Sequence, residues 1–340
     1  MNISEAIRQI IAKRDLTFEQ AHEVMGQIMG GQCTDAQIGA YLVGLQMKGE
    51  SPPEIAGSAR AMREALIPIP TRHSPEVVTD TCGTGGDGKD TFNISTIAAF
   101  VAAGAGVIIA KHGNRAVSSK CGSADVLKEL GINIEATPDV VGRCLDEVGI
   151  GFLFAPTLHP AMKYAIGPRR EIGVRSIFNI LGPLTNPAGA KRQVLGVFSA
   201  HLLPLMAETL QQLGAIHVMV VHSSDGLDEL SSTARVEVAE VKHGNISRWE
   251  MLGTTYGIPP AQEEDLKGGD PAHGARIAME ILQGEKGPKR DIVVLNAAAA
   301  IYVGGKADTL KDAIAVAQQS IDEGHAMRKL ERMKTVMSDK

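Results

Sequence analysis

The chain has 340 residues, and its 34 Lys and Arg against 39 Asp and Glu give a formal net charge of −5. This acidic balance argues against a sequence-independent nucleic-acid binder, because such proteins carry a basic excess. A hydrophobic content of 44% and a mean hydropathy of +0.01 exclude a disordered chain. The longest near-apolar run, residues 96–110, is shorter than the roughly 20 residues that a membrane span needs.

Cysteine usage and the N-terminus indicate the compartment. The four cysteines are scattered and none forms a CxxC pair, which argues against a zinc site and suits a reducing environment. The N-terminal residues show no basic segment followed by an apolar one, so no secretory signal is expected. The sequence therefore predicts a globular, cytoplasmic protein without a membrane segment.

The first seventy residues predict four amphipathic helices. Apolar residues between Ile3 and Ile11 recur at helical spacing. Thr17, Thr34 and Ser51 each open a capping box with Gln or Glu three residues later, and the fourth helix is expected to run to about Leu66. Four such helices can pack on one another, and their remaining apolar faces can pair with a second subunit.

From residue 77 onward, short β-branched runs alternate with helical stretches. The expected strands are 77–79, 107–109, 151–154, 194–197, 218–221 and 292–295, and the clearest helices are 138–148 and 202–213. This alternation predicts an α/β fold with a mostly parallel sheet that helices cover on both faces. Ligands of such sheets bind beyond the carboxyl ends of the strands, so the loops after the strands are the candidate sites.

A glycine-rich loop, Asp80–Thr96, follows the first expected strand and leads into an apolar helix that Asn93 or Ser95 is expected to cap. Its N–H groups and the helix N-terminus can hold phosphate oxygens. The dinucleotide fingerprint fails because no acidic residue occurs between Asp90 and Asp125. A P-loop fails because Asp90 stands where a Ser or Thr would bind magnesium. We therefore favour phosphate or pyrophosphate binding over a plain tight turn.

A second polar loop, Lys111–Ser123, follows the next expected strand. It holds three cations, three serines and an asparagine. Lys111 and Arg115 supply charge for phosphates, while hydroxyl and amide groups provide directional donors. The density of serines favours a ligand-binding loop over a merely solvated one.

An acidic pair, Asp228 and Glu229, follows the expected strand at 218–221. Adjacent carboxylates repel each other unless a cation lies between them, and Mg²⁺ prefers hard oxygen ligands and bridges to phosphates. With two phosphate-binding loops predicted nearby, we favour a magnesium–pyrophosphate site over a solvated turn.

Seven motifs, in this order, resemble those of the anthranilate phosphoribosyltransferases, over about residues 1–335. They are Gly-Thr-Gly-Gly-Asp at 83–87, Asn-x-Ser-Thr at 93–96, Lys-His-Gly-Asn-Arg at 111–115 with a serine pair at 118–119, Gly-Ser-Ala-Asp-Val-Leu at 122–127, His-Pro-Ala-Met-Lys at 159–163, Asn-x-Leu-Gly-Pro-Leu at 179–184 and Asp-Gly-Leu-Asp-Glu at 225–229.

The resemblance implies a small helical domain of residues 1–72 plus about 166–190, which forms a homodimer. It implies a larger α/β domain of about 73–165 plus 191–340, with a mostly parallel central sheet. The implied reaction transfers the phosphoribosyl group of 5-phosphoribosyl 1-diphosphate to the amine of anthranilate, with release of diphosphate, in tryptophan biosynthesis. Magnesium is implied as cofactor, as two ions, with no nucleic acid or membrane as partner.

The resemblance also implies the residues of the site. For the phosphoribosyl donor they are Gly83, Gly86, Asp87, Thr91, Asn93, Ser95, Thr96, Lys111, His112, Gly113, Asn114, Arg115, Ser118, Ser119 and Ser123. For anthranilate they are Gly83, His112, Asn114, His159 and Arg169, and for magnesium Ser95, Asp228 and Glu229. The guanidinium of Arg169 suits a carboxylate, as does that of its neighbour Arg170. No general base is implied, and transition-state stabilisation falls to Lys111 and the metal.

Two other functions remain open at this point. A pyrimidine nucleoside phosphorylase has the same fold and glycine loop, but it uses phosphate as the attacking group and has no need of the acidic pair. A non-catalytic relative that binds nucleic acid is opposed by the net charge of −5 and by the intact acidic pair.

Overall fold

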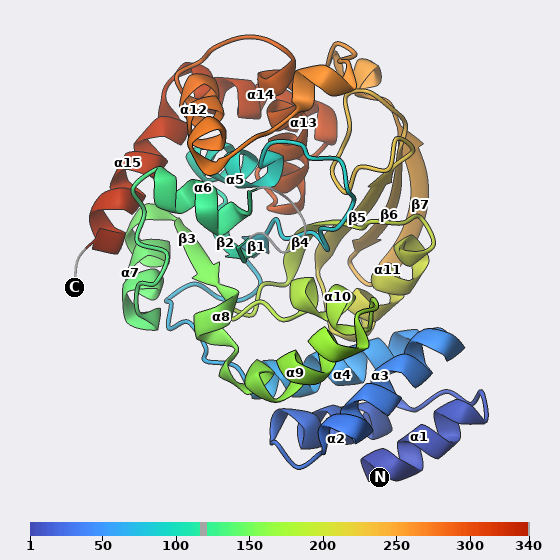
Figure 1. The fold of residues 1–340 in the computed structure, drawn as a ribbon. Helices are drawn as coiled ribbons and strands as arrows, with labels where there is room; N and C mark the ends of the chain where they lie inside the picture. The colour runs from blue at the N-terminus through green and yellow to red at the C-terminus, as the bar shows by residue number, and fades with distance from the viewer. Residues whose placement is uncertain (116–120, 339–340) are drawn as a thin grey trace.

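The computed structural model describes residues 1–115 and 121–338. Its first four helices, α1 (Ile3–Ile11), α2 (Phe18–Met29), α3 (Asp35–Lys48) and α4 (Pro52–Glu64), form a helical unit at one end of the molecule (Figure 1). The predicted capping boxes form: the Thr17 Oγ1 accepts a hydrogen bond from the Gln20 N–H, and the Gln20 side chain accepts one from the Thr17 N–H. The four predicted helices are thus confirmed.

A seven-stranded sheet forms the centre of the larger part, with the strand order β3-β2-β1-β4-β5-β6-β7. Its strands are β1 (Val78–Asp80), β2 (Ile108–Gly113), β3 (Ile150–Phe154), β4 (Arg192–Gly196), β5 (His217–Ser223), β6 (Val236–Lys242) and β7 (Asn245–Met251). The pairs among the first five strands are parallel, whereas β6 and β7 run antiparallel to their neighbours. The predicted α/β class with a mostly parallel sheet is confirmed.

Helices cover both faces of the sheet. Val218 and Val220 of β5 point into a core shared with the helical unit, while Met219 and Val221 point into the larger core on the other face. On that larger side, α5 and α13 pack together, with α14 and α15 around them (Figure 1). The helices after β1 are α5 (Ile94–Gly104), α6 (Ser123–Glu129), α7 (Pro138–Val148), α8 (Ala155–Leu158), α9 (Lys163–Ile172), α10 (Phe178–Leu181), α11 (Leu202–Gln212), α12 (Pro271–Leu282), α13 (Pro288–Val303), α14 (Leu310–Asp322) and α15 (His325–Ser338).

The segment after β3 returns to the helical unit. Ala165 of α9 and Phe178 of α10 are buried in the same core as the residues of α1–α4, and α9 packs on α3. This course accords with residues 166–190 belonging to the small domain. The boundaries at 72 and 190 stay a prediction.

The predicted strand at 292–295 is wrong, because these residues lie inside the helix α13. Ile292, Val293, Val294 and Leu295 are all buried, so the run shows no polar face that would reveal a helical period. A short apolar run of this kind fits a buried strand and a buried helix equally well. Within the described residues, no helix is both long and apolar enough to cross a membrane.

Candidate functional site

The candidate site lies at the carboxyl ends of β1, β2, β4 and β5. β1 pairs with β2 on one side and with β4 on the other, so the strand order reverses beside β1. Open α/β sheets bind ligands in the crevice at such a reversal. The three loops singled out in the sequence follow β1, β2 and β5 and therefore meet there.

The glycine loop packs against the acidic turn that follows β5. Gly85, Gly86 and Gly88 have φ values of +64°, +76° and +72°, a backbone region that residues with a Cβ rarely adopt. The Gly85 N–H donates a hydrogen bond of 2.8 Å to Oδ2 of Asp228. A Cβ on Gly83 would lie 3.1 Å from the same oxygen. The loop conformation thus depends on glycine where it approaches the carboxylate.

Three carboxylates converge beside this loop. Asp228 and Glu229 are half-buried, and the carboxyl of Asp87 contacts that of Asp228. Burial, together with the neighbouring negative charge of Glu229, raises the pKa of Asp228 well above its usual range, and burial raises the pKa of Glu229 to about 7. Buried Oδ2 of Asp87 has no hydrogen-bond partner among the described residues. The three carboxyl groups therefore crowd negative charge into one place, and that charge favours a bound cation.

The donor set of this acidic centre fits a hard divalent cation. Glu229 accepts a hydrogen bond of 3.2 Å from the N–H of Ser95, at the first turn of α5. A cavity of about 10 Å³ lies beside Ser95, Asp228 and Glu229, which is near the volume that one water-sized group requires. Carboxylate and hydroxyl oxygens are the ligands that Mg²⁺ prefers. The structure therefore brings together all three residues predicted for magnesium, and it adds Asp87.

Lys111 supplies the positive charge next to this centre. Its side chain is buried at the end of β2, and Nζ donates to the carbonyl and hydroxyl oxygens of Thr81, both at 3.2 Å. Nζ also lies 3.4 Å from Oγ of Ser95. Its charge opposes the effect of burial on the pKa values of Asp80 and Glu229. The predicted donor-binding lysine thus lies beside the predicted metal ligand Ser95.

Asp80 borders the candidate site and was not among the residues predicted from the sequence. This buried carboxylate accepts hydrogen bonds from the His112 N–H at 3.1 Å and from Nδ2 of Asn186 at 2.7 Å. Asn186 donates also to the carbonyl of Ala110 at 2.8 Å, and burial raises the pKa of Asp80 to about 6. Asp80 thus fixes the end of β2, from which Lys111 and His112 project. The available signal was an aspartate at the carboxyl end of the first strand.

His112 and His159 form a buried pair. Their Nε2 atoms lie 3.1 Å apart, although the two residues are 47 positions apart in the chain. Burial lowers the pKa of His112 to about 3 and that of His159 to about 4, so both imidazoles are neutral near pH 7. One ring therefore donates its N–H and the other accepts. These two residues, both predicted for anthranilate, lie together.

Arg169 lies on α9, with its guanidinium carbon 5.0 Å from the ring centroid of Phe178. Partial burial lowers its pKa, and Arg170 beside it is exposed. The described contacts of Arg169 connect it with α10 and the helical unit. Its predicted place beside the histidine pair and Gly83 stays a prediction.

The loop after β2 is described only in part. The carbonyl of Asn114 accepts hydrogen bonds from Oγ of Ser123 and from the N–H that follows it, and a Cβ on Gly113 would lie 2.5 Å from the same Oγ. The side chain of Arg115 pairs with Glu135 at 3.1 Å. Ser118 and Ser119, both predicted for the donor, lie outside the described residues.

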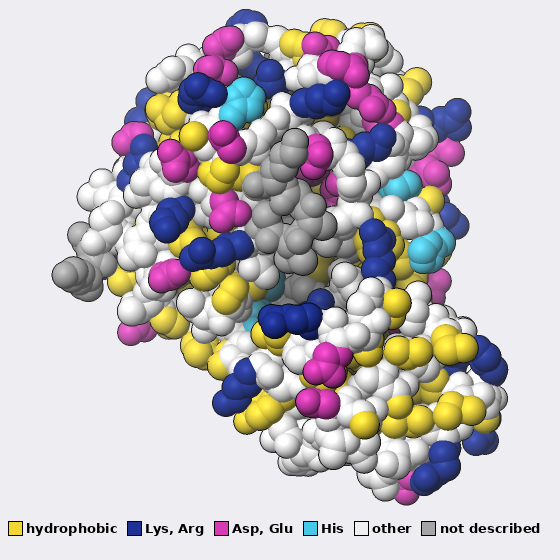
Figure 2. Space-filling view, viewed as in Figure 1, with side chains coloured by type: hydrophobic (Ala, Val, Ile, Leu, Met, Phe, Trp, Pro, Cys, Tyr) yellow, Lys and Arg dark blue, Asp and Glu magenta, His cyan; other side chains and the backbone are white. Residues whose placement is uncertain are grey.

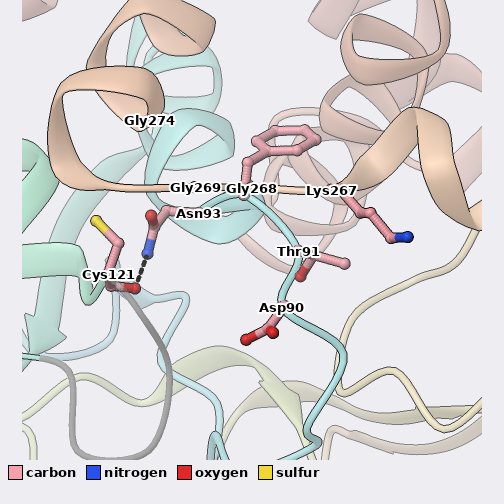
Figure 3. A pocket seen from close by; sticks show the side chains of 9 residues that line it. Asp90, Thr91, Asn93, Cys121, Lys267, Gly268, Gly269 and Gly274 are labelled. Atoms are coloured by element: carbon pink, nitrogen blue, oxygen red, sulfur yellow. Dashed lines mark hydrogen bonds between the residues drawn. The ribbon is translucent and has the colours of Figure 1, made fainter.

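Two of the other predicted donor residues, Thr91 and Asn93, line a cavity of about 290 Å³ next to α5 (Figure 3). Thr91 and Asn93 form one wall, and residues 267–269 form another. Asn93 occupies the N-cap position of α5, but its amide donates to the Cys121 carbonyl at 3.4 Å instead of capping the helix. Asn93 is thus confirmed as the N-cap residue, although its side chain makes no capping hydrogen bond, and Ser95 lies inside the helix. Thr96 is buried in the first turn.

Positively and negatively charged side chains are mixed on the face of the molecule that Figure 2 shows. Figure 2 shows Lys and Arg interspersed with Asp and Glu over the larger part of the chain. Proteins that bind nucleic acid without sequence preference present a basic stripe or patch. The charge distribution on the visible face differs from that pattern.

Comparisons with known proteins agree over the whole chain. The family models described as glycosyl transferase family, helical bundle domain, and glycosyl transferase family, a/b domain, match residues 4–66 and 75–327. The anthranilate phosphoribosyltransferases of Moorella thermoacetica and of Thermoanaerobacter sp. are 52% and 53% identical to this chain, and each alignment covers 96% of both proteins.

Solved structures give the same result. The crystal structure of the Thermus thermophilus anthranilate phosphoribosyltransferase superposes with a TM-score of 0.93 at 45% identity and covers 98% of this chain and 99% of that one. The Saccharomyces cerevisiae enzyme in complex with PRPP and Mg has a TM-score of 0.90 at 26% identity, covering 99% and 98%. The yeast enzyme has also been solved with 4-fluoroanthranilate, with a TM-score of 0.88 at 25% identity, covering 99% and 97%.

Proposed function

The chain belongs to the anthranilate phosphoribosyltransferase family, and on this premise we propose that it transfers the phosphoribosyl group of 5-phosphoribosyl 1-diphosphate to the amine of anthranilate. The products are N-(5-phosphoribosyl)anthranilate and diphosphate, in tryptophan biosynthesis. The observation that carries this proposal is the contact of the glycine loop with the half-buried acidic pair, through Gly85 and Asp228, next to Lys111.

In this proposal the donor's diphosphate binds beside the glycine loop and the N-terminus of α5. The loop amides and the N-terminus of α5 favour an anion, and Lys111 adds a full positive charge. As the bond from the ribose carbon to the diphosphate oxygen breaks, its electron pair leaves with the diphosphate and positive charge develops on the carbon. Lys111 and the loop amides stabilise the negative charge on the leaving group. Their placement supports the donor residues predicted from the sequence.

Magnesium use is supported by the acidic centre and by the yeast relative that was solved with PRPP and Mg. Ser95, Asp228 and Glu229, joined by Asp87, would hold the metal, which supplies positive charge to the diphosphate when bound. The neighbouring carboxylates of Asp87, Asp228 and Glu229, together with the negative charge of the donor's diphosphate, balance two divalent ions, so we propose two. The uncompensated oxygen of Asp87 supports its inclusion among the ligands.

On the acceptor side, the neutral histidine pair suits an aniline nucleophile. The amine attacks with its lone pair, so it must stay unprotonated, and imidazoles whose pKa values are about 3 and 4 carry no proton to give it near neutral pH. The guanidinium of Arg169 is the proposed partner of the anthranilate carboxylate. Once the new carbon–nitrogen bond has formed, the cationic nitrogen is acidic and releases its proton without a dedicated base.

We further propose that the protein is a homodimer that forms through its helical unit and works in the cytoplasm. Large exposed apolar side chains occur on this unit and on α9, with Met47 exposed to 73% and Ile11 to 71%. Figure 2 shows hydrophobic side chains gathered on the same end of the molecule. All four cysteines are thiols, as suits a reducing compartment. Light scattering of the wild type and of Met47→Asp tests the dimer, which the charge should dissociate if α3 lies at the interface.

The reaction is tested by the loss of anthranilate fluorescence on addition of 5-phosphoribosyl 1-diphosphate, first with magnesium and then with EDTA. A loss that depends on magnesium supports donor, acceptor and metal together. If the folded protein gives no loss, the proposal is wrong. Phosphorolysis of thymidine then tests the phosphorylase alternative, and salt-dependent DNA binding tests the nucleic-acid alternative.

A further inference from the structure

Arg175 connects the helical side of the molecule with the glycine loop. It lies between α9 and α10, and its neighbours Ile177 and Phe178 are buried in the core of the helical unit. Its Nη2 donates a hydrogen bond of 2.8 Å to the carbonyl of Gly86. This is a charge-assisted bond to a loop that is predicted to bind the donor.

The same guanidinium stacks on the ring of Phe198, and the backbone of Phe198 is hydrogen-bonded to the glycine loop. The guanidinium carbon of Arg175 lies 4.0 Å from the ring centroid of Phe198, just after β4. The Phe198 N–H donates to Oγ1 of Thr84 at 3.1 Å, and the Thr84 N–H donates to the Gly196 carbonyl at 2.9 Å. Thr84 is thus hydrogen-bonded directly to the end of β4 and the residues after it. Gly86 is connected to the same segment through Arg175.

These contacts determine the orientation of one peptide group. In a trans peptide the C=O of one residue and the N–H of the next point in opposite directions. The Gly86 carbonyl is directed to Arg175, so the Asp87 N–H is directed away from it. Gly86 has a φ of +76° and no side chain to oppose rotation of this peptide. Without Arg175, rotation of the peptide would direct the carbonyl dipole towards the bound anion.

We propose that Arg175 is a positioning residue for the phosphoribosyl donor, which it serves by holding the Gly86–Asp87 peptide in the orientation that presents the Asp87 amide and carboxylate to the diphosphate and its metal. This inference rests on the proposed function and deepens it. Arginine suits the task better than lysine, because its planar guanidinium donates in a fixed direction while it stacks on a ring.

The test compares Arg175→Ala and Arg175→Lys with the wild type. Arg60→Ala is the matched control, because Arg60 is an exposed arginine of α4 that is paired with Glu64. Calorimetric titration with 5-phosphoribosyl 1-diphosphate and magnesium, without anthranilate, gives the donor Kd. We expect Arg175→Ala to raise this Kd about tenfold, a loss typical of one hydrogen bond to a charged group, and Arg175→Lys to give an intermediate value. In Arg175→Ala the KM for anthranilate and the Tm should stay at the wild-type values. In the control Arg60→Ala, the donor Kd, the KM for anthranilate and the Tm should all stay at the wild-type values.

A second variant separates positioning from direct contact with the diphosphate. Phe198→Leu removes the ring but no charge, and we expect it to raise the donor Kd in the same direction. The double variant should bind the donor no more weakly than Arg175→Ala alone, because both changes release the same peptide.

Each contrary result overturns the inference. An unchanged donor Kd in Arg175→Ala excludes the positioning role, and a Tm that falls along with every kinetic constant assigns Arg175 to stability instead. Full rescue by lysine, with no effect of Phe198→Leu, shows that Arg175 binds the diphosphate directly. A wild type that binds the donor but leaves anthranilate unchanged contradicts the proposed function only, while the titrations still decide on Arg175. A wild type that does not bind the donor overturns both.

Discussion

The N–H of Gly85 donates to Oδ2 of Asp228 at 2.8 Å, across 143 positions of the chain. This bond joins the loop after β1 to the turn after β5, so the backbone proposed to bind the diphosphate and the carboxylates proposed to hold magnesium lie side by side. Parallel strands make this arrangement possible, because their carboxyl ends lie at one edge of the sheet. The same geometry brings Lys111 from the end of β2 to Thr81 and Ser95.

Neutralising the acidic pair should weaken magnesium binding. In Asp228→Asn with Glu229→Gln, two carboxylates become amides of nearly the same size, so packing is preserved and negative charge is lost. We expect the magnesium concentration for half-maximal activity to rise at least tenfold. The Tm in metal-free buffer should equal or exceed that of the wild type, since the repulsion between two half-buried carboxylates is removed. Activity titrated with magnesium measures the effect. Glu208→Gln, on the exposed side of α11, is the control, and an unchanged magnesium response of the double variant would contradict the assignment.

Removal of the Lys111 ammonium should slow transfer. In Lys111→Ala the leaving diphosphate loses a preorganised positive charge, which is an effect of about 10²- to 10³-fold in comparable sites. We expect kcat/KM for the donor to fall by that order, whereas Lys128→Ala, an exposed lysine of α6, should keep the wild-type value. Steady-state rates with the fluorescence assay measure it, and the assignment fails if kcat/KM is unaltered.

Much of the site was predictable because its motifs are local and follow strands. The glycine loop and Lys111 each stand directly after a β-branched run, and the acidic pair lies in the turn that follows another, so the parallel sheet brings them to one edge. The four N-terminal helices were equally clear, since capping boxes and apolar spacing are properties of a few adjacent residues. Local patterns of this kind need no knowledge of tertiary contacts.

The residues that the sequence analysis missed act through contacts between distant segments. Asn186 reaches Asp80 from 106 positions away, and Arg175 reaches Gly86 from 89 positions away, while no local pattern marks either residue. The interpretation of residues 292–295 as a strand failed for a related reason. Those side chains are buried on every side of α13, and only the packing of that helix on α5 and α14 distinguishes it from a strand.

Folding stability should depend on pH through His159. Burial lowers its pKa from about 6.5 to about 4, so between these values the unfolded chain binds more protons than the native one. Stability contributed by neutral His159 is thus present above pH 6.5 and lost as the pH falls towards 4. We expect the Tm of the wild type to fall more steeply than that of His159→Gln between pH 6.5 and 4.5. The pKa of Asp80 is raised to about 6, so protonation of Asp80 stabilises the native protein as the pH falls, opposite to the effect of His159. Both the wild type and His159→Gln contain Asp80, so the difference between their Tm curves reports on His159. Parallel curves would show that His159 titrates normally.

In the helical unit, a buried and an exposed ion pair offer a direct comparison. Glu54 is fully buried, pairs with Lys48 at 2.8 Å and accepts the Leu16 N–H at 3.0 Å. Glu54→Gln leaves the Lys48 ammonium without that partner, and we expect a loss of about 3–5 kcal/mol of unfolding free energy. Glu64 is half exposed and pairs with Arg60 at 2.8 Å, so Glu64→Gln should cost under about 1 kcal/mol. Urea unfolding of both variants measures the contrast, and equal losses would contradict the structural account.

Finally, the acidic turn should move when Gly196 at the end of β4 receives a side chain. A Cβ there would lie 1.5 Å from the Asp228 carbonyl oxygen, so Gly196→Ala must displace the backbone of the turn, although no charge changes. We expect the magnesium concentration for half-maximal activity to rise, as in the charge-neutralised double variant, together with a lower Tm from the forced displacement. Gly26→Ala, at a helical position of α2 with open space around the added carbon, is the matched control. It should preserve the magnesium response and should not lower the Tm, because alanine favours a helix over glycine. If Gly196→Ala retains the wild-type magnesium response, the position of the turn does not control metal binding, and the carboxylates reach the metal independently of the backbone that carries them.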